Sequence, residues 1–135
     1  MGAWGPDTFE NDEACDWTYE LHDGGMQHVL AGLEACFKDP WDPLEASTAV
    51  EGLAASDVIA RLAGRFGQQN AYTETADCWA GAQPDAPSPE LLARAREAVD
   101  RILGPGSELA RLWRETGDDS AWRICVSELR KRLEP

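Results

Sequence analysis

Residues 42–65 read DPLEASTAVEGLAASDVIARLAGR and are rich in alanine. Asp42 suits the N-cap of a helix, Pro43 suits its first helical position, and Glu45 completes the spacing of a capping box. Apolar side chains then recur around most of the helix circumference, at Val50, Leu53, Ala54, Val58, Ile59, Leu62, Ala63 and Phe66. A helix with so little polar surface must be covered on nearly all sides. The pattern therefore predicts a buried helix at the centre of the domain.

Shorter amphipathic segments lie on both sides of this central helix. Apolar side chains at helical spacing, separated by turn residues, predict further helices at 11–23, 26–37, 73–82, 88–103, 107–117 and 118–133. Asn11, Ser88, Ser107 and Asp118 are expected to cap four of these helices. No segment alternates between apolar and polar residues, so little or no sheet is expected. The predicted fold is all-α, with five to seven helices in a single compact domain over residues 1–135 and an irregular N-terminal arm.

Acidic side chains dominate the chain, and most of the excess lies in its first half. The 135 residues carry a formal net charge of −13. Residues 1–60 contain thirteen acidic side chains, and Lys38 is their only basic one. Such a charge disfavours binding to nucleic acid, whose phosphates are held by Lys and Arg. It favours a basic protein as partner, and the simpler alternative is a solvated acidic surface that keeps the protein soluble.

The cysteines and the chain start bear on the cellular compartment. No apolar run is long enough to span a membrane, and the chain opens without the basic and apolar regions of a signal peptide. We therefore expect a cytoplasmic protein without membrane contact. Disulfides are rare in that reducing compartment, so all four cysteines are expected to be small buried apolar side chains: Cys15, Cys36, Cys78 and Cys125.

Two thiols and two imidazoles form the one candidate metal set. Cys15 and His22 are seven positions apart, and His28 and Cys36 are eight apart, so each pair can share one face of a helix. Together they would make a legitimate tetrahedral zinc set. The spacing departs from the short loops that structural zinc sites favour, and Cys36 also has a core position in the apolar pattern. The sequence therefore assigns no metal and no cofactor, and this quartet is kept as an alternative.

Asp57 is a carboxylate inside the apolar run of the central helix. If it is buried it must be paired or protonated, because an isolated buried charge is costly. A carboxyl group of raised pKa could serve as a general base or bind a ligand. The structural alternative is a pairing with a helix terminus, an indole N–H or an Arg from the C-terminal half.

Asn11 and Asp12 form a second polar pair, placed in sequence between Trp4 and Trp17. Helix capping accounts for both side chains. A binding role would require the two indoles to line a cleft, whereas Trp4 is otherwise expected to dock the arm on the core.

Other tryptophans divide into two groups. Those at helical core positions are Trp17, Trp113 and Trp122. Trp41 and Trp79 lie in connecting regions, where exposed indoles beside acidic residues could form a protein-recognition patch. The alternative is that both indoles close over the core from loops.

The two ends of the chain carry a further pattern. Residues 1–5 read MGAWG, residues 9–12 read FEND, and DW follows at 16–17. Near the other end are SEL at 107–109, LW at 112–113 and WRICVSEL at 122–129. These stretches resemble a bacterial family known as domain of unknown function 4259. The resemblance implies a small soluble bacterial protein, and it implies no reaction and no catalytic residues.

The sequence leaves three functions open. The first is a non-enzymatic interaction protein, such as an immunity protein against a basic toxin, whose acidic half holds a basic partner through carboxylates such as Glu13, Glu20 and Glu34. The second is a small-molecule-binding or sequestering protein with an interhelical pocket lined by tryptophans and Asp57. The third is an unrecognised enzyme, although the chain contains no recognisable catalytic motif.

Overall fold

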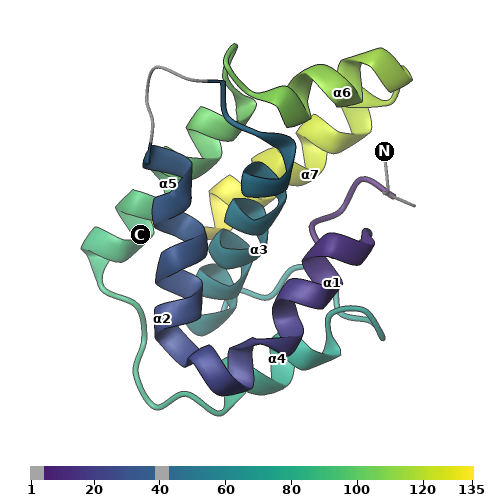
Figure 1. Cartoon of the computed structure of the whole chain (residues 1–135). Helices are drawn as coiled ribbons and strands as arrows, with labels where there is room; N and C mark the ends of the chain where they lie inside the picture. The colour runs from purple at the N-terminus through teal and green to yellow at the C-terminus, as the bar shows by residue number, and fades with distance from the viewer. Residues whose placement is uncertain (1–4, 39–42) are drawn as a thin grey trace.

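The structure is a computed structural model that describes residues 5–38 and 43–135. Its helices in chain order are α1 (Asp12–Tyr19), α2 (Leu21–Glu34), the short 3-10 helix η1 (Ala35–Phe37), α3 (Ala46–Leu62), α4 (Glu74–Gly81), α5 (Pro89–Leu103), α6 (Glu108–Thr116) and α7 (Asp119–Arg132) (Figure 1). In the described part of the chain no strand is present, and β-type pairing is limited to isolated bridges such as the one between Leu44 and Ser107. The predicted all-α class is therefore confirmed.

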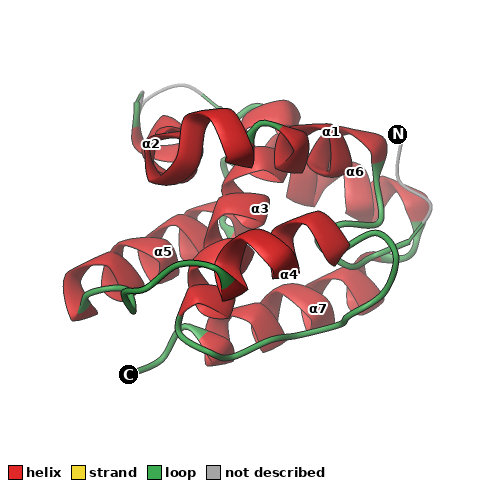
Figure 2. Cartoon of the chain, turned by 90° about the horizontal axis from the view of Figure 1, so that it is seen from below, coloured by secondary structure: helices red, strands yellow, loops and turns green. Residues whose placement is uncertain are grey.

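Helix α3 is the centre of the molecule, as its sequence predicts. Every residue from Gly52 to Arg61 is buried, whichever way its side chain points. The α1–α2 pair covers one side of α3 and α7 covers the other, while α4, α5 and α6 complete the enclosure (Figures 1 and 2). None of the helices in the described residues combines the length and the apolar character needed to cross a membrane.

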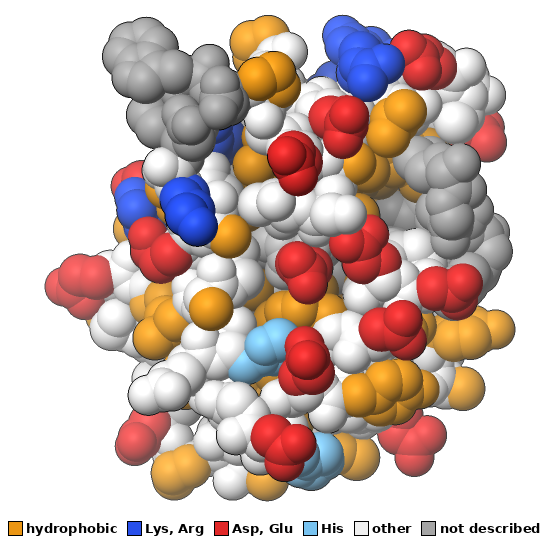
Figure 3. All heavy atoms as spheres, in the orientation of Figure 1, with side chains coloured by type: hydrophobic (Ala, Val, Ile, Leu, Met, Phe, Trp, Pro, Cys, Tyr) orange, Lys and Arg blue, Asp and Glu red, His pale blue; other side chains and the backbone are white. Residues whose placement is uncertain are grey.

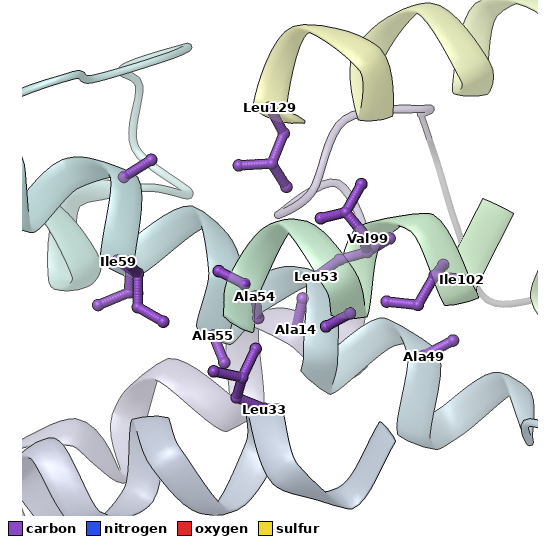
Figure 4. Close-up of a cluster of buried hydrophobic side chains, with 14 of the residues drawn as sticks. Ala14, Leu33, Ala49, Leu53, Ala54, Ala55, Ile59, Val99, Ile102 and Leu129 are labelled. Atoms are coloured by element: carbon purple, nitrogen blue, oxygen red, sulfur yellow. The ribbon is translucent and has the colours of Figure 1, made fainter. Parts of the chain in front are cut away.

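One continuous apolar core holds these helices together. Side chains from α1, α2, α5 and α7 converge on the alanine-rich surface of α3 (Figure 4). The fully or almost fully buried residues of this core, with those of α3 included, are among others Ala14, Leu33, Ala54, Ala55, Ile59, Val99, Ile102 and Leu129. Small residues on α3 allow its neighbours to approach closely. A Cβ at Gly52 would collide with the Cys36 sulfur and lie 3.3 Å from Ile102 Cδ1. Glycine is therefore required where the end of the α2–η1 segment crosses α3.

Helix capping follows the sequence at most predicted positions. Asn11 Oδ1 accepts a hydrogen bond from Ala14 N at 2.7 Å, and Ser88 and Ser107 cap α5 and α6 in the same way. Gly117 ends α6 in the left-handed conformation at φ 83°. Asp118 occupies the N-cap position of α7 as predicted, but its side chain makes no capping hydrogen bond.

The start of α3 differs from the prediction. The helix begins at Ala46 rather than Pro43, and the expected cap Asp42 lies outside the described residues. Glu45 occupies the N-cap position without a side-chain capping bond. A distant residue supplies it instead, since Glu108 Oε1 accepts the Ala46 N–H at 2.8 Å. The N-termini of α3 and α6 are thereby joined, and the bridge at Leu44 reinforces the junction.

The predicted helix at 11–23 is also divided in the structure. Helix α1 ends at Tyr19, and α2 starts at Leu21 after a turn at Glu20. The break expected at the double glycine is present as a kink within α2, where Gly25 has φ 55° and ψ −141°. A left-handed φ is accessible to glycine without strain from a Cβ, so the kink falls there.

Candidate binding site

Four exposed carboxylates lie along one side of α1. They are Asp12, Glu13, Asp16 and Glu20, and we call this set the acidic face. A helix advances about 100° per residue, so these four positions fall within an arc of about 100°. Figure 3 shows the side of the molecule formed by α1 and α2, over which acidic side chains are spread while Lys and Arg gather toward its upper part.

The two halves of the chain differ in how many of their acidic side chains form ion pairs. The described acidic residues before position 60 that form no ion pair with a Lys or Arg of the described chain are Asp7, Glu10, Asp12, Glu13, Asp16, Glu20, Asp23, Glu45 and Glu51. After position 60 most acidic residues have such a partner, as in the Asp100–Arg130 pair at 2.7 Å. The acidic excess in the first half of the sequence therefore leaves carboxylates without a Lys or Arg partner in the described chain, and these are concentrated around α1.

Glu34 does not belong to this unpaired group, although its sequence position predicted that it would. Both of its carboxylate oxygens accept hydrogen bonds from Arg94 of α5, at 2.9 and 2.8 Å. The Arg94 guanidinium also lies 3.6 Å from the ring centroid of Phe37. This hydrogen bonding holds the pKa of Glu34 below its usual value. Its charge is thus balanced within the protein and is less available to a partner.

Glu51 connects the acidic face to α3. Partial burial raises the pKa of Glu51, and the nearby charges of Glu13 and Glu20 raise it further. His28 opposes this effect, and its ring stacks on Trp17 with centroids 4.4 Å apart. The carboxylates around α1 are therefore close enough to repel one another, as expected for a surface without balancing cations.

A pocket of about 340 Å³ opens beside the acidic face, between the N-terminal arm, α1, α3, α6 and α7. Its walls are mainly apolar and include Val50, Leu53, Leu109, Leu112 and Val126. Trp113 and Trp122 also line it, and their rings stack with centroids 6.3 Å apart and planes inclined by 10°. The indole pair joins α6 to α7 and gives the pocket an aromatic wall. This is the interhelical pocket that small-molecule binding would require, but Asp57 does not line it.

The charged side chains at this pocket are all acidic. Asp7, Asp12 and Glu13 line it, and no Lys, Arg or His is present among its described lining residues. Asp7 is partly buried, and its Oδ1 accepts the Thr8 N–H at 2.8 Å. Burial raises the pKa of Asp7 despite this hydrogen bond. The pocket is therefore suited to an apolar group that carries a positive charge.

Asp57 is fully buried and belongs to an ion-pair network within the core. Its two oxygens accept hydrogen bonds from Arg132 of α7 at 2.9 and 3.2 Å. Arg61, one turn further along α3, lies 3.2 Å from the same carboxylate. Asp57 is therefore paired with an Arg from the C-terminal half, which was the structural alternative to a catalytic or ligand-binding role. Both oxygens of this fully buried carboxylate are taken up by guanidinium groups, so Asp57 is not accessible to a substrate as a general base.

Arg61 extends the network to the other side of α3. Its Nη1 pairs with Asp77 of α4, and its Nη2 donates to the Gln68 carbonyl at 3.0 Å. Thr73 Oγ1 donates to the second oxygen of Asp77 at 2.8 Å. The Nε atom of Arg61 is buried without a hydrogen bond of good geometry. The network links α3 to the next helix, α4, and to the distant α7, and its place in the core points to a structural role.

The two cysteines and two histidines kept as an alternative zinc set are not assembled into a site. Among the described residues, no group of three or more His, Cys, Asp or Glu is arranged to hold a metal ion. His22 is exposed, while His28 Nε2 lies 2.9 Å from the Trp17 carbonyl. Cys15 Sγ donates to the Phe9 carbonyl, and Cys36 is buried against α3. These side chains have separate local partners, so they do not form one site.

The expectation that all four cysteines are buried is wrong for three of them. Cys36 is buried, which raises the pKa of its thiol to about 11. Cys15 and Cys125 are half-buried, and Cys78 is exposed on the short helix α4. The helical period placed Cys78 on an apolar stripe, but an eight-residue helix packs only part of that stripe against the core.

Among the tryptophans, the three predicted core positions are confirmed: Trp17, Trp113 and Trp122 are buried. Trp79 is 7% exposed and belongs to the core, so it offers no recognition patch. Trp4 and Trp41, the two other candidates, lie outside the described residues. Asn11 caps α1 as the simpler interpretation requires, and it also lines the pocket beside Asp12.

Two features of the site were missed by reasoning from sequence. The Asp57–Arg61 contact had a signal, because the two residues stand four positions apart on one helix. An interhelical pocket lined by tryptophans was one of the alternatives, but no signal indicated which tryptophans would line it. Trp113 and Trp122 were each assigned to the core, and nothing in the local pattern indicated that their packing would leave a hollow beside Asp7.

Together, the fold and the site define a small all-α protein with an acidic face, an apolar pocket beside it and an ionic network in its core. The profile of one family, described as a domain of unknown function (DUF4259), matches residues 2–124. The chain therefore belongs to this family, as the resemblance at its two ends predicted. No curated protein and no solved structure matches it.

Proposed function

We propose that this protein is a non-enzymatic binding protein whose acidic face holds a basic protein partner. The observation that carries the proposal is the concentration of unpaired carboxylates around α1, in a protein whose other acidic residues are mostly paired. Unpaired charge of one sign raises the encounter rate with an oppositely charged partner and fixes its orientation. An immunity protein that blocks a basic toxin is the specific form of this function that we favour.

The local geometry suits such a role. The acidic face lies on a short helix whose buried side, including Ala14 and Trp17, packs on the core. The carboxylates are therefore presented from a backbone that is already ordered, so binding does not have to fix the conformation of this segment. Glu51 adds a further unbalanced charge behind Glu13 and Glu20.

Charge reversal on the acidic face tests the proposal. A Glu13→Lys, Asp16→Lys, Glu20→Lys variant is compared with a Glu74→Lys, Asp85→Lys, Glu90→Lys variant. The control residues are exposed carboxylates outside the acidic face that form no ion pair with a described Lys or Arg, so both variants change the net charge equally.

Each protein is immobilised and exposed to a lysate of its source organism at low and high salt. We expect the wild type and the control variant to retain a basic protein at low salt and to release it at high salt, because screening weakens surface electrostatics. The acidic-face variant should lose at least tenfold of that binding. Equal retention by all three proteins, or retention that salt does not affect, would contradict the proposal.

A further inference from the structure

We propose that the pocket between the N-terminal arm, α1, α3, α6 and α7 binds a small organic cation, namely an amine whose apolar body contains one or two aromatic rings. The pocket shares Asp12 and Glu13 with the acidic face, but its apolar walls come from α3, α6 and α7, which lie outside that face. The inference therefore goes beyond partner binding and does not depend on it.

The apolar body of the ligand is indicated by the walls of the pocket. Its volume of about 340 Å³ is near the lower end of the range for ligand pockets, which suits one or two rings. Leu109, Leu112 and Val126 supply aliphatic surface, and the parallel rings of Trp113 and Trp122 supply a flat aromatic wall. Transfer of an aromatic ring from water to such a surface is favourable, and offset stacking adds to it.

The positive charge of the ligand is indicated by the lining carboxylates of Asp7, Asp12 and Glu13, which have no Lys, Arg or His beside them in the described lining. The N-termini of α1 and α3 also reach the pocket, and each carries about half a positive charge. The Asn11 side chain caps α1, and the carboxylate of Glu108 binds the first N–H of α3. Within the described lining, the three carboxylate charges therefore outweigh the two partial charges of the helix termini.

Asp7 gives a specific reason for a cation. It is partly removed from water, accepts one backbone hydrogen bond and forms no ion pair with a described Lys or Arg. Among the charges that act on Asp7, those of Asp57 and Glu10 raise its pKa further, and that of Arg132 opposes them as the smallest effect. A bound ammonium group would relieve the cost of this partly desolvated carboxylate. A cation–π contact with Trp122 is already made by Arg123, whose guanidinium lies 5.9 Å from the ring centroid, so no such contribution is assigned to the ligand.

Three probes of one shape and different charge test the proposal on the full chain: 2-naphthylmethylammonium, 2-naphthalenemethanol and 2-naphthylacetate. We expect calorimetry at neutral pH to rank the ammonium first, the alcohol second and the carboxylate last. Methyl NMR shifts on ammonium binding should appear at Val50, Leu112 and Val126. They should be absent at Leu33, which lies in the core away from the pocket.

Two matched double variants on α1 locate the charge effect. Asp12→Asn, Glu13→Gln neutralises lining carboxylates, whereas Asp16→Asn, Glu20→Gln removes the same charge outside the lining. The first should weaken ammonium binding by about two- to twentyfold, on the scale of two exposed ion pairs, and leave the alcohol unchanged. The second should change ammonium binding less than twofold.

Several outcomes would overturn the inference: no binding of any probe at millimolar concentration, equal affinity for all three, or equal losses in the two double variants. Methyl shifts confined to another part of the molecule would overturn it as well. If the probes fail while salt-sensitive capture of a basic protein persists, only the pocket inference is lost. If capture fails while the ammonium still binds, only the proposed function is lost.

Discussion

Asp57 and Asp16 carry the same carboxylate group on neighbouring helices, yet their surroundings are opposite. Asp57 is fully buried and is held by Arg132, with Arg61 at 3.2 Å. Asp16 is exposed on α1 and forms no ion pair with a Lys or Arg of the described residues. The buried carboxylate organises the protein itself, because an uncompensated charge there would be very costly. The exposed one is left for solvent or for a partner.

This comparison shows why the net charge of a segment is a poor guide to its surface. Glu34 and Asp57 contribute to the acidic excess of residues 1–60, but arginines from α5 and α7 balance both. The carboxylates of α1 have no such partner. The proposed binding surface rests on the carboxylates that remain unpaired after folding, and the total number of acidic residues does not identify them.

The largest expected effect on stability is at the buried carboxylate, Asp57. Asp57→Asn keeps the size of the side chain but leaves Arg61 and Arg132 without their shared anion. We expect the free energy of unfolding to fall by about 3–5 kcal/mol, measured by urea denaturation. Asp100→Asn, which removes the exposed partner of Arg130, is the control and should cost about 1 kcal/mol or less. If Asp57→Asn lowered the free energy of unfolding as little as is expected for Asp100→Asn, the Asp57 network would not be structurally important.

A moderate effect is expected at Asn11, the N-cap of α1. Asn11→Ala removes the cap on Ala14 N and should lower the free energy of unfolding by about 1 kcal/mol. Because Asn11 also lines the pocket, binding of 2-naphthylmethylammonium should be measured alongside stability. A loss of stability with little loss of binding would identify Asn11 as a capping residue, and the reverse pattern would assign it to the ligand.

A smaller effect, dependent on pH, is expected at Glu34. Its pKa is lowered from the usual 4.5, chiefly by the Arg94 hydrogen bonds, so its charged form stabilises the folded state above that pH. Glu34→Gln should therefore be less stable than the wild type at neutral pH. The difference should shrink as pH falls below 4.5 through the lowered pKa. Thermal unfolding at several pH values measures this, and a difference that persists in acid would contradict the assignment.

The smallest effect should have the opposite sign and lies at Glu51. Burial and the neighbouring carboxylates raise its pKa above 4.5, so ionisation of Glu51 opposes folding. Its favourable contribution is fully present below pH 4.5 and is lost as pH rises through the raised pKa. Glu51→Gln should therefore be slightly more stable than the wild type at neutral pH and equal to it in acid. A loss of stability at neutral pH would mean that Glu51 has a stabilising partner.

Local signals predicted most of the helices, since caps and periodicity depend on residues a few positions apart. Asn11, Ser88 and Ser107 cap the helices they were expected to cap. Predictions failed where the deciding contact was distant. The start of α3 is set by Glu108, which follows Ala46 by 62 positions. Of the candidate site, Asp12 and Glu13 were identified from sequence, whereas the aromatic wall at Trp113 and Trp122 was not.

The sequence by itself determined an all-α protein with an alanine-rich helix at its centre and an acidic first half, because these properties follow from composition and from short-range spacing. Only the tertiary structure decided which carboxylates are balanced. Asp57 meets Arg132 across 75 positions, and Glu34 meets Arg94 across 60. The pocket likewise exists only where five segments meet. Such pairings depend on the packing of the whole chain, and no local pattern encodes them.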